Sequence, residues 1–132
     1  MAVKDLRRSP MMCHLLDALE NGEDIGHYGR LTFVMVARPF VESDELVRLL
    51  MQDKDTDEAK ARALVQQVVD REYSPPGWGR ILEWQAKQDF PICPNPEDHD
   101  GCNVYRELNF PDKVFDHIGE YREQRAEHIA LP

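Results

Sequence analysis

The sequence DFPICPNPEDHDGCNVYRELNFP, residues 89–111, decides how the chain can fold, because it has neither a helical nor a strand period. It contains two of the three cysteines, Cys93 and Cys102, among several prolines and an acidic run at 97–100. Long segments without secondary structure are uncommon in compact domains unless they are functional or disordered. Apolar and aromatic residues interleaved through the segment argue against disorder. We therefore expect a metal ion or metal cluster to anchor this loop.

The length and composition indicate a single domain over residues 1–132, with frayed ends at 1–8 and 122–132. The longest apolar run, residues 31–37, is far shorter than the roughly 20 residues that a membrane span requires. The N-terminal residues carry positive charges without a following apolar region, so we expect no secretion signal, a cytoplasmic location and no membrane partner. In that compartment, widely spaced cysteines are expected to be thiols or metal ligands rather than disulfide bridges.

The net charge of −9 argues against a protein that binds nucleic acid over its whole surface, because phosphate neutralisation requires Lys and Arg. Basic residues recur at Arg30 and Arg38, whereas acidic residues gather at 42–45, 53–58 and 97–100. Any nucleic-acid site must therefore be local.

Hydrophobic periodicity predicts an all-α fold of about six helices around one core. The first helix is expected over residues 10–21, after an N-cap at Ser9. The next, over 25–38, is apolar nearly all round; its β-branched residues leave a strand as an alternative, but its length favours a buried helix that ends before Pro39. Further helices are expected from N-cap Ser43, from N-cap Asp55 with Glu58 in a capping box, from about Arg80 to Gln88, and from Pro111 or Asp112.

The three cysteines are candidate metal ligands. Cys93 and Cys102 are spaced too widely for the Cys pair of a zinc finger. A single cysteine is more often a small buried apolar residue than a ligand, but a proline-rich loop offers two cysteines little apolar core. Cys13, in the first turn of the expected helix over 10–21, can join them only through a tertiary contact.

A second candidate site consists of His27, Arg30 and Arg38. On a helix these positions fall near one side, so their side chains can converge on one anion. The alternative is structural: the two arginines pair with internal carboxylates and His27 is a satisfied histidine at a helix start.

The order of these features resembles the C-terminal iron–sulfur domain of the large subunit of archaeal and eukaryotic DNA primase. That family begins with a Cys on a helix and continues with a His-x-x-Arg segment and a downstream basic residue. Cys13, the HYGR segment at 27–30 and Arg38 stand at these places.

The later motifs of the family also have counterparts. Its Tyr-x-Pro-Pro-x-Cys turn corresponds to YSPPGW at 73–78, and its last two cysteines correspond to Cys93 and Cys102. The match extends over about residues 9 to 118. The resemblance implies that Cys13, Cys93 and Cys102 hold an iron–sulfur cluster.

The chain departs from the family at Trp78, which replaces the second cluster cysteine. A [4Fe–4S] cluster normally takes four protein ligands, and here three thiolates remain. A three-iron cluster, zinc with three Cys and one His, or a packed core without metal are the alternatives. Candidates for the fourth ligand are His99, Asp98, His14, Asp100 and an external group.

The resemblance implies a binding function rather than a catalytic one. In the family this domain holds the 5′-triphosphate of the initiating nucleotide or primer and the adjoining template, while a separate subunit or domain catalyses primer synthesis. His27, Arg30 and Arg38 occupy the matching basic positions. The expected partners are a primase catalytic subunit or fused primase-polymerase domain, an NTP and a primer–template. The alternatives are a redox or iron-sensing Fe–S protein and a zinc-stabilised helical interaction domain.

Overall fold

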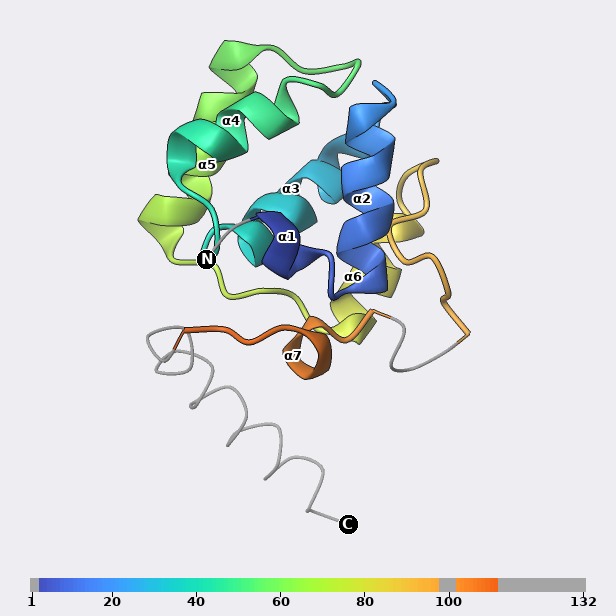
Figure 1. Cartoon of the computed structure of the whole chain (residues 1–132). Helices are drawn as coiled ribbons and strands as arrows, with labels where there is room; N and C mark the ends of the chain where they lie inside the picture. Colours follow the sequence, from blue (N-terminus) through green and yellow to red (C-terminus); the bar gives the residue numbers. More distant parts are fainter. Residues whose placement is uncertain (1–2, 98–101, 112–132) are drawn as a thin grey trace.

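The computed structural model describes residues 3–97 and 102–111, which form helices and no strand (Figure 1). The predicted all-α class is confirmed for this part of the chain. None of the helices within it is long and apolar enough to cross a membrane. The helices are α1 (Val3–Leu6), α2 (Pro10–Glu20), α3 (Gly26–Ala37), α4 (Ser43–Leu50), α5 (Glu58–Arg71), α6 (Trp78–Gln85) and α7 (Val104–Glu107).

Helix α3 forms the centre of the fold. All residues from 31 to 37 are buried, and the helix packs against α2, α4, α5 and α6 (Figure 1). The helix therefore has no polar face, in agreement with the prediction of a buried helix rather than a strand. It ends at Ala37, and its C-cap Arg38 still has helical angles, with φ −49° and ψ −42°. The helix stops there because Pro39 has no N–H to continue the hydrogen-bond ladder.

Two side chains from distant parts of the chain fix the start of α3. Its N-cap, Ile25, has no side-chain oxygen to cap the helix. Instead, the buried Asp53 carboxylate accepts the Ile25 N–H at 2.9 Å, and the Gln88 Oε1 accepts the Tyr28 N–H at 2.9 Å. Free N–H groups at a helix start require such partners. Asp24 adds a local one, because its carboxylate accepts the Gly26 N–H at 2.9 Å.

Gln88 also joins α3 to the loop that follows α6. Its Nε2 donates to the Ile25 carbonyl at 2.9 Å and to the Phe90 carbonyl at 3.0 Å. Gly26 makes this arrangement feasible, because it has a φ of +79° and a Cβ at this position would overlap the Gln88 amide. The Gln88 side chain therefore requires both the conformation and the small size of Gly26.

Helix starts are only partly as expected. Ser9 accepts the Met12 N–H at 3.3 Å, which confirms the predicted N-cap of α2. Helix α5 is capped by Asp57, whose carboxylate accepts the Lys60 N–H at 2.8 Å, and the predicted Asp55 cap is wrong. The Asp55 N–H donates to the Asp53 carboxylate at 2.7 Å, so Asp55 belongs to the turn that precedes the helix. Helix α4 begins one residue earlier than expected, with Glu42 rather than Ser43 as its N-cap.

The beginning of the chain is more ordered than expected. Leu6 of α1 is fully buried, although residues 1–8 were expected to fray. Arg7 pairs with Asp17 at 3.0 Å and with Glu20 at 3.2 Å, which joins α1 to α2. The hydrogen bond with Asp17 raises the pKa of the Arg7 guanidinium above its ordinary value. The helix predicted from Pro111 or Asp112 and the tail at 122–132 lie outside the described residues.

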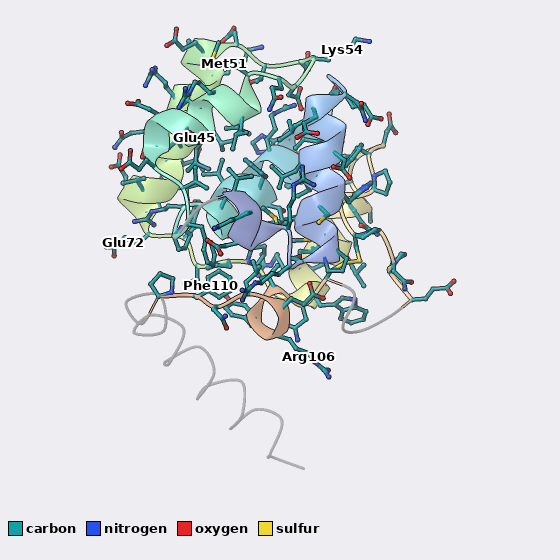
Figure 2. All side chains as sticks on the ribbon, in the orientation of Figure 1. Glu45, Met51, Lys54, Glu72, Arg106 and Phe110 are labelled. Carbon is teal, nitrogen blue, oxygen red and sulfur yellow. A yellow bond between two sulfur atoms is a disulfide. The ribbon has the colours of Figure 1, made fainter. Side chains whose placement is uncertain are left out.

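The surface of the helical body is strongly charged. In Figure 2, charged side chains such as Glu45, Lys54 and Glu72 project from its outer side. Met51, at the end of α4, is the large apolar side chain most open to solvent among the described residues, at 44% exposure. The described residues thus enclose their apolar side chains in one core.

We predict that Gln88→Ala lowers the free energy of unfolding by about 1–3 kcal/mol, because it leaves the Tyr28 N–H and the Ile25 carbonyl without their partner. Urea unfolding followed by circular dichroism measures the change. Gln66→Ala is the matched control, since the Gln66 amide binds only Asp70 on the exposed face of α5. The control is expected to change stability by no more than about 0.5 kcal/mol. Equal effects of the two variants would contradict the anchoring function of Gln88.

Candidate functional site

The structure places two of the three candidate metal ligands together. Cys93 and Cys102 are joined by a disulfide, with Cα atoms 5.7 Å apart, and both are buried. This separation lies within the range of about 4.4–6.8 Å that a disulfide allows. The prediction that the cysteines are thiols or metal ligands rather than a disulfide bridge is therefore wrong for Cys93 and Cys102 in this structure.

The third candidate, Cys13, is a free thiol in the first turn of α2. It is half-buried, and its Sγ donates to the Arg7 carbonyl at 3.0 Å. Within 3–97 and 102–111, no group of three or more His, Cys, Asp or Glu side chains is arranged to hold a metal ion. The described residues thus supply a close pair of sulfurs, which is half of the four ligands that an iron–sulfur cluster normally takes.

The candidates for a fourth ligand are placed as follows. His14 already has two contacts, because its Nε2 lies 2.7 Å from the Pro91 carbonyl and its ring stacks on Phe90 at 5.1 Å. Trp78 is the first residue of α6, after N-cap Gly77. His99, Asp98 and Asp100 lie outside the described residues.

Protein groups hold the first part of the cysteine loop. The Cys93 N–H donates to the Gln85 Oε1 at 2.8 Å, and Ile92 is fully buried. Together with the contacts of His14 and Gln88, these groups fix residues 88–93 against α2, α3 and α6. The sequence argument that a metal must anchor this loop underestimated such contacts, since side-chain amides far away in sequence cannot be matched to a loop from periodicity.

Arg30, the central residue of the predicted anion site, is paired with carboxylates. Its Nη1 lies 3.2 Å from Asp53 and 3.1 Å from Asp24. The Asp53 side chain is fully buried and the Arg30 side chain is only 13% exposed. Removing one member of a buried pair leaves the other charge uncompensated. Arg30 therefore has the structural function that the sequence left as an alternative.

His27 and Arg38 lie at opposite ends of α3. His27 is exposed in the first turn, with its ring edge-on to Tyr28 at 5.3 Å. Arg38 follows the last turn, about 16 Å further along the helix than His27 at the rise of an α-helix. It borders an open hollow beside Val41 and Ser43, and its guanidinium makes no ion pair within the described part of the chain.

A row of aromatic and basic side chains, not foreseen from the sequence, starts at His27. Tyr28 stacks on Trp84 of α6 at 5.8 Å, and the Lys87 Nζ lies 5.9 Å from the centre of the Tyr28 ring. We call His27, Tyr28, Trp84 and Lys87 the aromatic strip. Stacked rings beside cations are the usual composition of surfaces that bind single-stranded nucleic acid.

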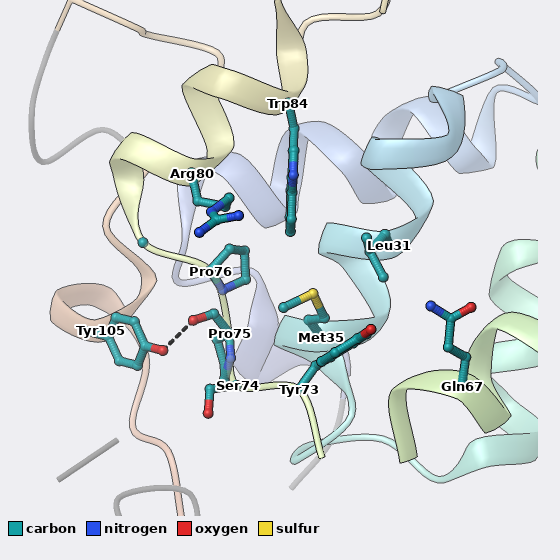
Figure 3. A pocket seen from close by; sticks show the side chains of 11 residues that line it. Leu31, Met35, Gln67, Tyr73, Ser74, Pro75, Pro76, Arg80, Trp84 and Tyr105 are labelled. Atoms are coloured by element: carbon teal, nitrogen blue, oxygen red, sulfur yellow. Dashed lines mark hydrogen bonds between the residues drawn. The ribbon is translucent and has the colours of Figure 1, made fainter. Parts of the chain in front are cut away.

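The aromatic strip leads to a pocket of about 530 Å³, which we call the Pro75 pocket (Figure 3). Its volume lies within the range of about 300–1,000 Å³ that ligand sites occupy. Trp84 belongs to both the strip and the pocket. The Tyr105 hydroxyl of α7 donates to the Pro75 carbonyl and holds the turn that forms one wall. The sequence shows prolines and aromatics at 73–84, but only the packing of α3, α5, α6 and α7 makes a pocket from them.

We predict that reduction of the Cys93–Cys102 bridge lowers the free energy of unfolding by about 2–3 kcal/mol, the chain-entropy contribution of so short a loop. Alkylation of the denatured, unreduced protein should label Cys13 alone, and mass spectrometry counts the labels. Cys13→Ala serves as the control, because it leaves the bridge intact. Three labelled thiols in air-oxidised protein, with no effect of reductant on melting, would contradict the bridge.

Comparisons with known proteins leave these residues as the basis for a function. No protein-family model, curated protein or solved structure matches the chain. A function can therefore be inferred only from the geometry of three features: the cysteines, the basic residues of α3 and the aromatic strip.

Proposed function

We propose that this domain binds the 5′-triphosphate end of an initiating nucleotide or primer, together with the adjoining template, as an accessory part of a primase or primase-polymerase. The observation that carries the proposal is the aromatic strip, which begins at His27, one of the basic residues of the predicted triphosphate site. Rings accept unpaired bases by stacking, and cations contact phosphates. The choice of a 5′-triphosphate as the ligand comes from the resemblance in motif order to the primase large subunit.

The net charge of −9 is compatible with this function if the site is local. His27, Lys87 and Arg38 are cations or hydrogen-bond donors available for phosphate. Arg30 contributes in another way: both of its ion pairs use Nη1, and within the described residues its Nη2 and Nε have no partner. Arginine presents several N–H donors in one plane, so Arg30 can hold Asp53 and still donate to a phosphate.

The proposal assigns no catalytic residue to this domain. Nucleotidyl transfer by two metal ions requires converging carboxylates, and in the primase family these belong to a separate subunit or domain. The proposed partner is therefore a catalytic subunit or a fused primase-polymerase domain, which acts on the NTP and primer–template that this domain holds.

An iron–sulfur cluster is part of the proposal. Cys93 and Cys102, once reduced, would hold it together with Cys13, and His99 or Asp98 is the proposed fourth ligand. The close Cys93–Cys102 pair fits two adjacent ligands, since both sulfurs are buried in one place. The bridge and the cluster are then alternative states of the same cysteines. When bound, the cluster would supply a fixed anchor for residues 93–102, and zinc is the alternative metal.

The second candidate function is redox or iron sensing. It is favoured by the same pair of cysteines, because two thiols that form a bridge in the absence of a metal can report oxidation or metal loss. A zinc-stabilised interaction domain would use the same ligands without redox chemistry.

We predict that Arg38→Ala weakens binding to a primer–template with a 5′-triphosphate by about 1.5–3 kcal/mol, the contribution of a charge-assisted contact. Binding to the same duplex with a 5′-hydroxyl should change far less. Fluorescence anisotropy at several salt concentrations measures both, and the salt slope should fall by about one unit. Arg38 is preferred to Arg30, because Arg30→Ala would leave Asp53 buried and unpaired and lower stability by about 3–5 kcal/mol.

Arg62→Ala is the matched control for this experiment. Arg62 is an exposed arginine of α5, paired with Glu58 and Asp44 on the surface. Its removal should change binding to both duplexes equally and only slightly. Equal affinity of the unmodified domain for the two 5′ ends would defeat the triphosphate proposal and favour the redox alternative.

We predict that protein prepared without oxygen contains iron and has visible charge-transfer absorbance, and that Cys93→Ser abolishes both. Metal analysis of the two proteins, with parallel melting curves, makes the test. Cys13→Ser separates a three-cysteine site from a two-cysteine site, since Cys13 lies outside the bridged pair. Stoichiometric zinc without iron would replace the cluster by a structural zinc site. Absence of both metals would leave the cysteines as a bridge.

A further inference from the structure

The Pro75 pocket has an apolar floor and aromatic walls. Leu31 and Met35 of the buried helix α3 form the floor, and Trp84 of α6 forms a wall (Figure 3). Tyr73 and the Pro75–Pro76 turn lie opposite α6. Rigid rings and prolines on a packed helix keep such a pocket open without a ligand, because their side chains have few alternative rotamers.

The polar groups of the pocket are few and uncommitted. Arg80, on α6, is 63% exposed and has only a long ion pair of 3.8 Å with Glu83. Such an exposed pair contributes little free energy and is readily exchanged for another anion. Within the described residues, the Gln67 amide and the Tyr73 hydroxyl have no hydrogen-bond partner, and both residues line the pocket. The hydroxyl of Ser74 also lines the pocket. The pocket therefore offers flat apolar surfaces, several neutral hydrogen-bonding groups and one cation.

We propose that the Pro75 pocket receives one unpaired base of a single-stranded nucleic acid, and that Arg80 contacts a phosphate of the same strand. The base lies against Trp84 or Tyr73, and the Gln67 amide is available to its polar edge. A base has an apolar face, a hydrogen-bonding edge and a nearby phosphate, which matches these three kinds of group. This inference rests on the proposed function, because it names where the template strand is held.

Continuity with the aromatic strip supports a nucleic acid rather than a small apolar ligand. Trp84 stacks with Tyr28 and also lines the pocket, so rings follow one another from His27 to Trp84, and Tyr73 lies in the same pocket lining. The cations Lys87 and Arg80 accompany this row. A strand with its backbone along these cations would place its deepest base in the pocket, beside Trp84.

The experiment uses a labelled single-stranded 12-nucleotide DNA with a 5′-hydroxyl end and a single abasic site moved along its length. Fluorescence anisotropy with the full chain at low salt measures each affinity. If one base occupies the pocket, one position should weaken binding by roughly 5- to 100-fold, the contribution of one stacked base, and the other positions much less. The wild-type protein carries this readout, so no variant has to fold.

Variants then locate the base. Trp84→Leu should weaken binding of the intact strand and remove the difference between intact and abasic strands. Arg80→Ala, an exposed change, should weaken binding by about the same factor for both strands. Arg106→Ala is a control for exposed charge on α7, outside the pocket lining. Because the chain has only two tryptophans, quenching of Trp84 fluorescence in a Trp78→Phe protein reports the stacked base directly.

The outcomes separate this inference from the proposed function. Equal weakening at every abasic position, or a Trp84→Leu protein that still distinguishes intact from abasic strands, would overturn the base pocket. A wild-type domain that prefers the 5′-triphosphate duplex yet shows no abasic dependence would keep the proposed function and sink the pocket. A domain with abasic dependence but no preference between 5′ ends would keep the pocket and sink the triphosphate site.

Discussion

The fold depends on how the start of the buried helix α3 is held. Its N-cap, Ile25, has no capping side chain, and the neighbouring Asp24 accepts only the Gly26 N–H. The Ile25 and Tyr28 N–H groups are bound by Asp53, from the turn before α5, and by Gln88, from the turn after α6. Each of these residues makes further contacts: Asp53 with Arg30 and Asp55, Gln88 with Ile25 and Phe90. The two turns are thereby fixed to the central helix and to each other. The apolar faces of such a helix can pack in several rotations about its axis, because apolar contacts are not directional. Polar contacts at its ends fix its position.

This arrangement explains why the candidate binding residues differ in character although they share one helix. Arg30 belongs to the buried network at the start of α3, whereas His27 points to solvent one turn earlier and Arg38 follows the last turn. A helix that forms the core has polar residues only where it emerges from it. Residues that stabilise the fold are then close neighbours of the candidate binding residues. A loss of binding in an α3 variant can therefore be interpreted only when the stability of that variant has also been measured.

The helical class, the bounds of α2 and the burial of α3 could be predicted from the sequence, because they follow from local periodicity and from Ser9 and Pro39. The start of α5 could not, since Asp55 and Asp57 are both suitable N-cap residues and only the structure shows that Asp57 accepts the Lys60 N–H while Asp55 lies in the preceding turn. For the candidate site, the sequence indicated the residues but not their partners. It left the pairing of Arg30 undecided and missed the Pro75 pocket, since both depend on contacts between residues far apart in the chain.

The hydrogen bond from Tyr105 to the Pro75 carbonyl links the chemistry of the sulfurs to the shape of the pocket. Tyr105 lies in the short helix α7, which begins two residues after Cys102, so this hydrogen bond connects the bridged cysteines to the wall of the pocket. Thermodynamic reciprocity then constrains both ends. If a ligand in the pocket favours one position of α7, ligand binding must shift the midpoint potential of the cysteine pair. Oxidation of the pair must then change the affinity of the pocket by the same free energy. Occupation of the pocket would then be measurable as a shift in the midpoint potential of the cysteine pair.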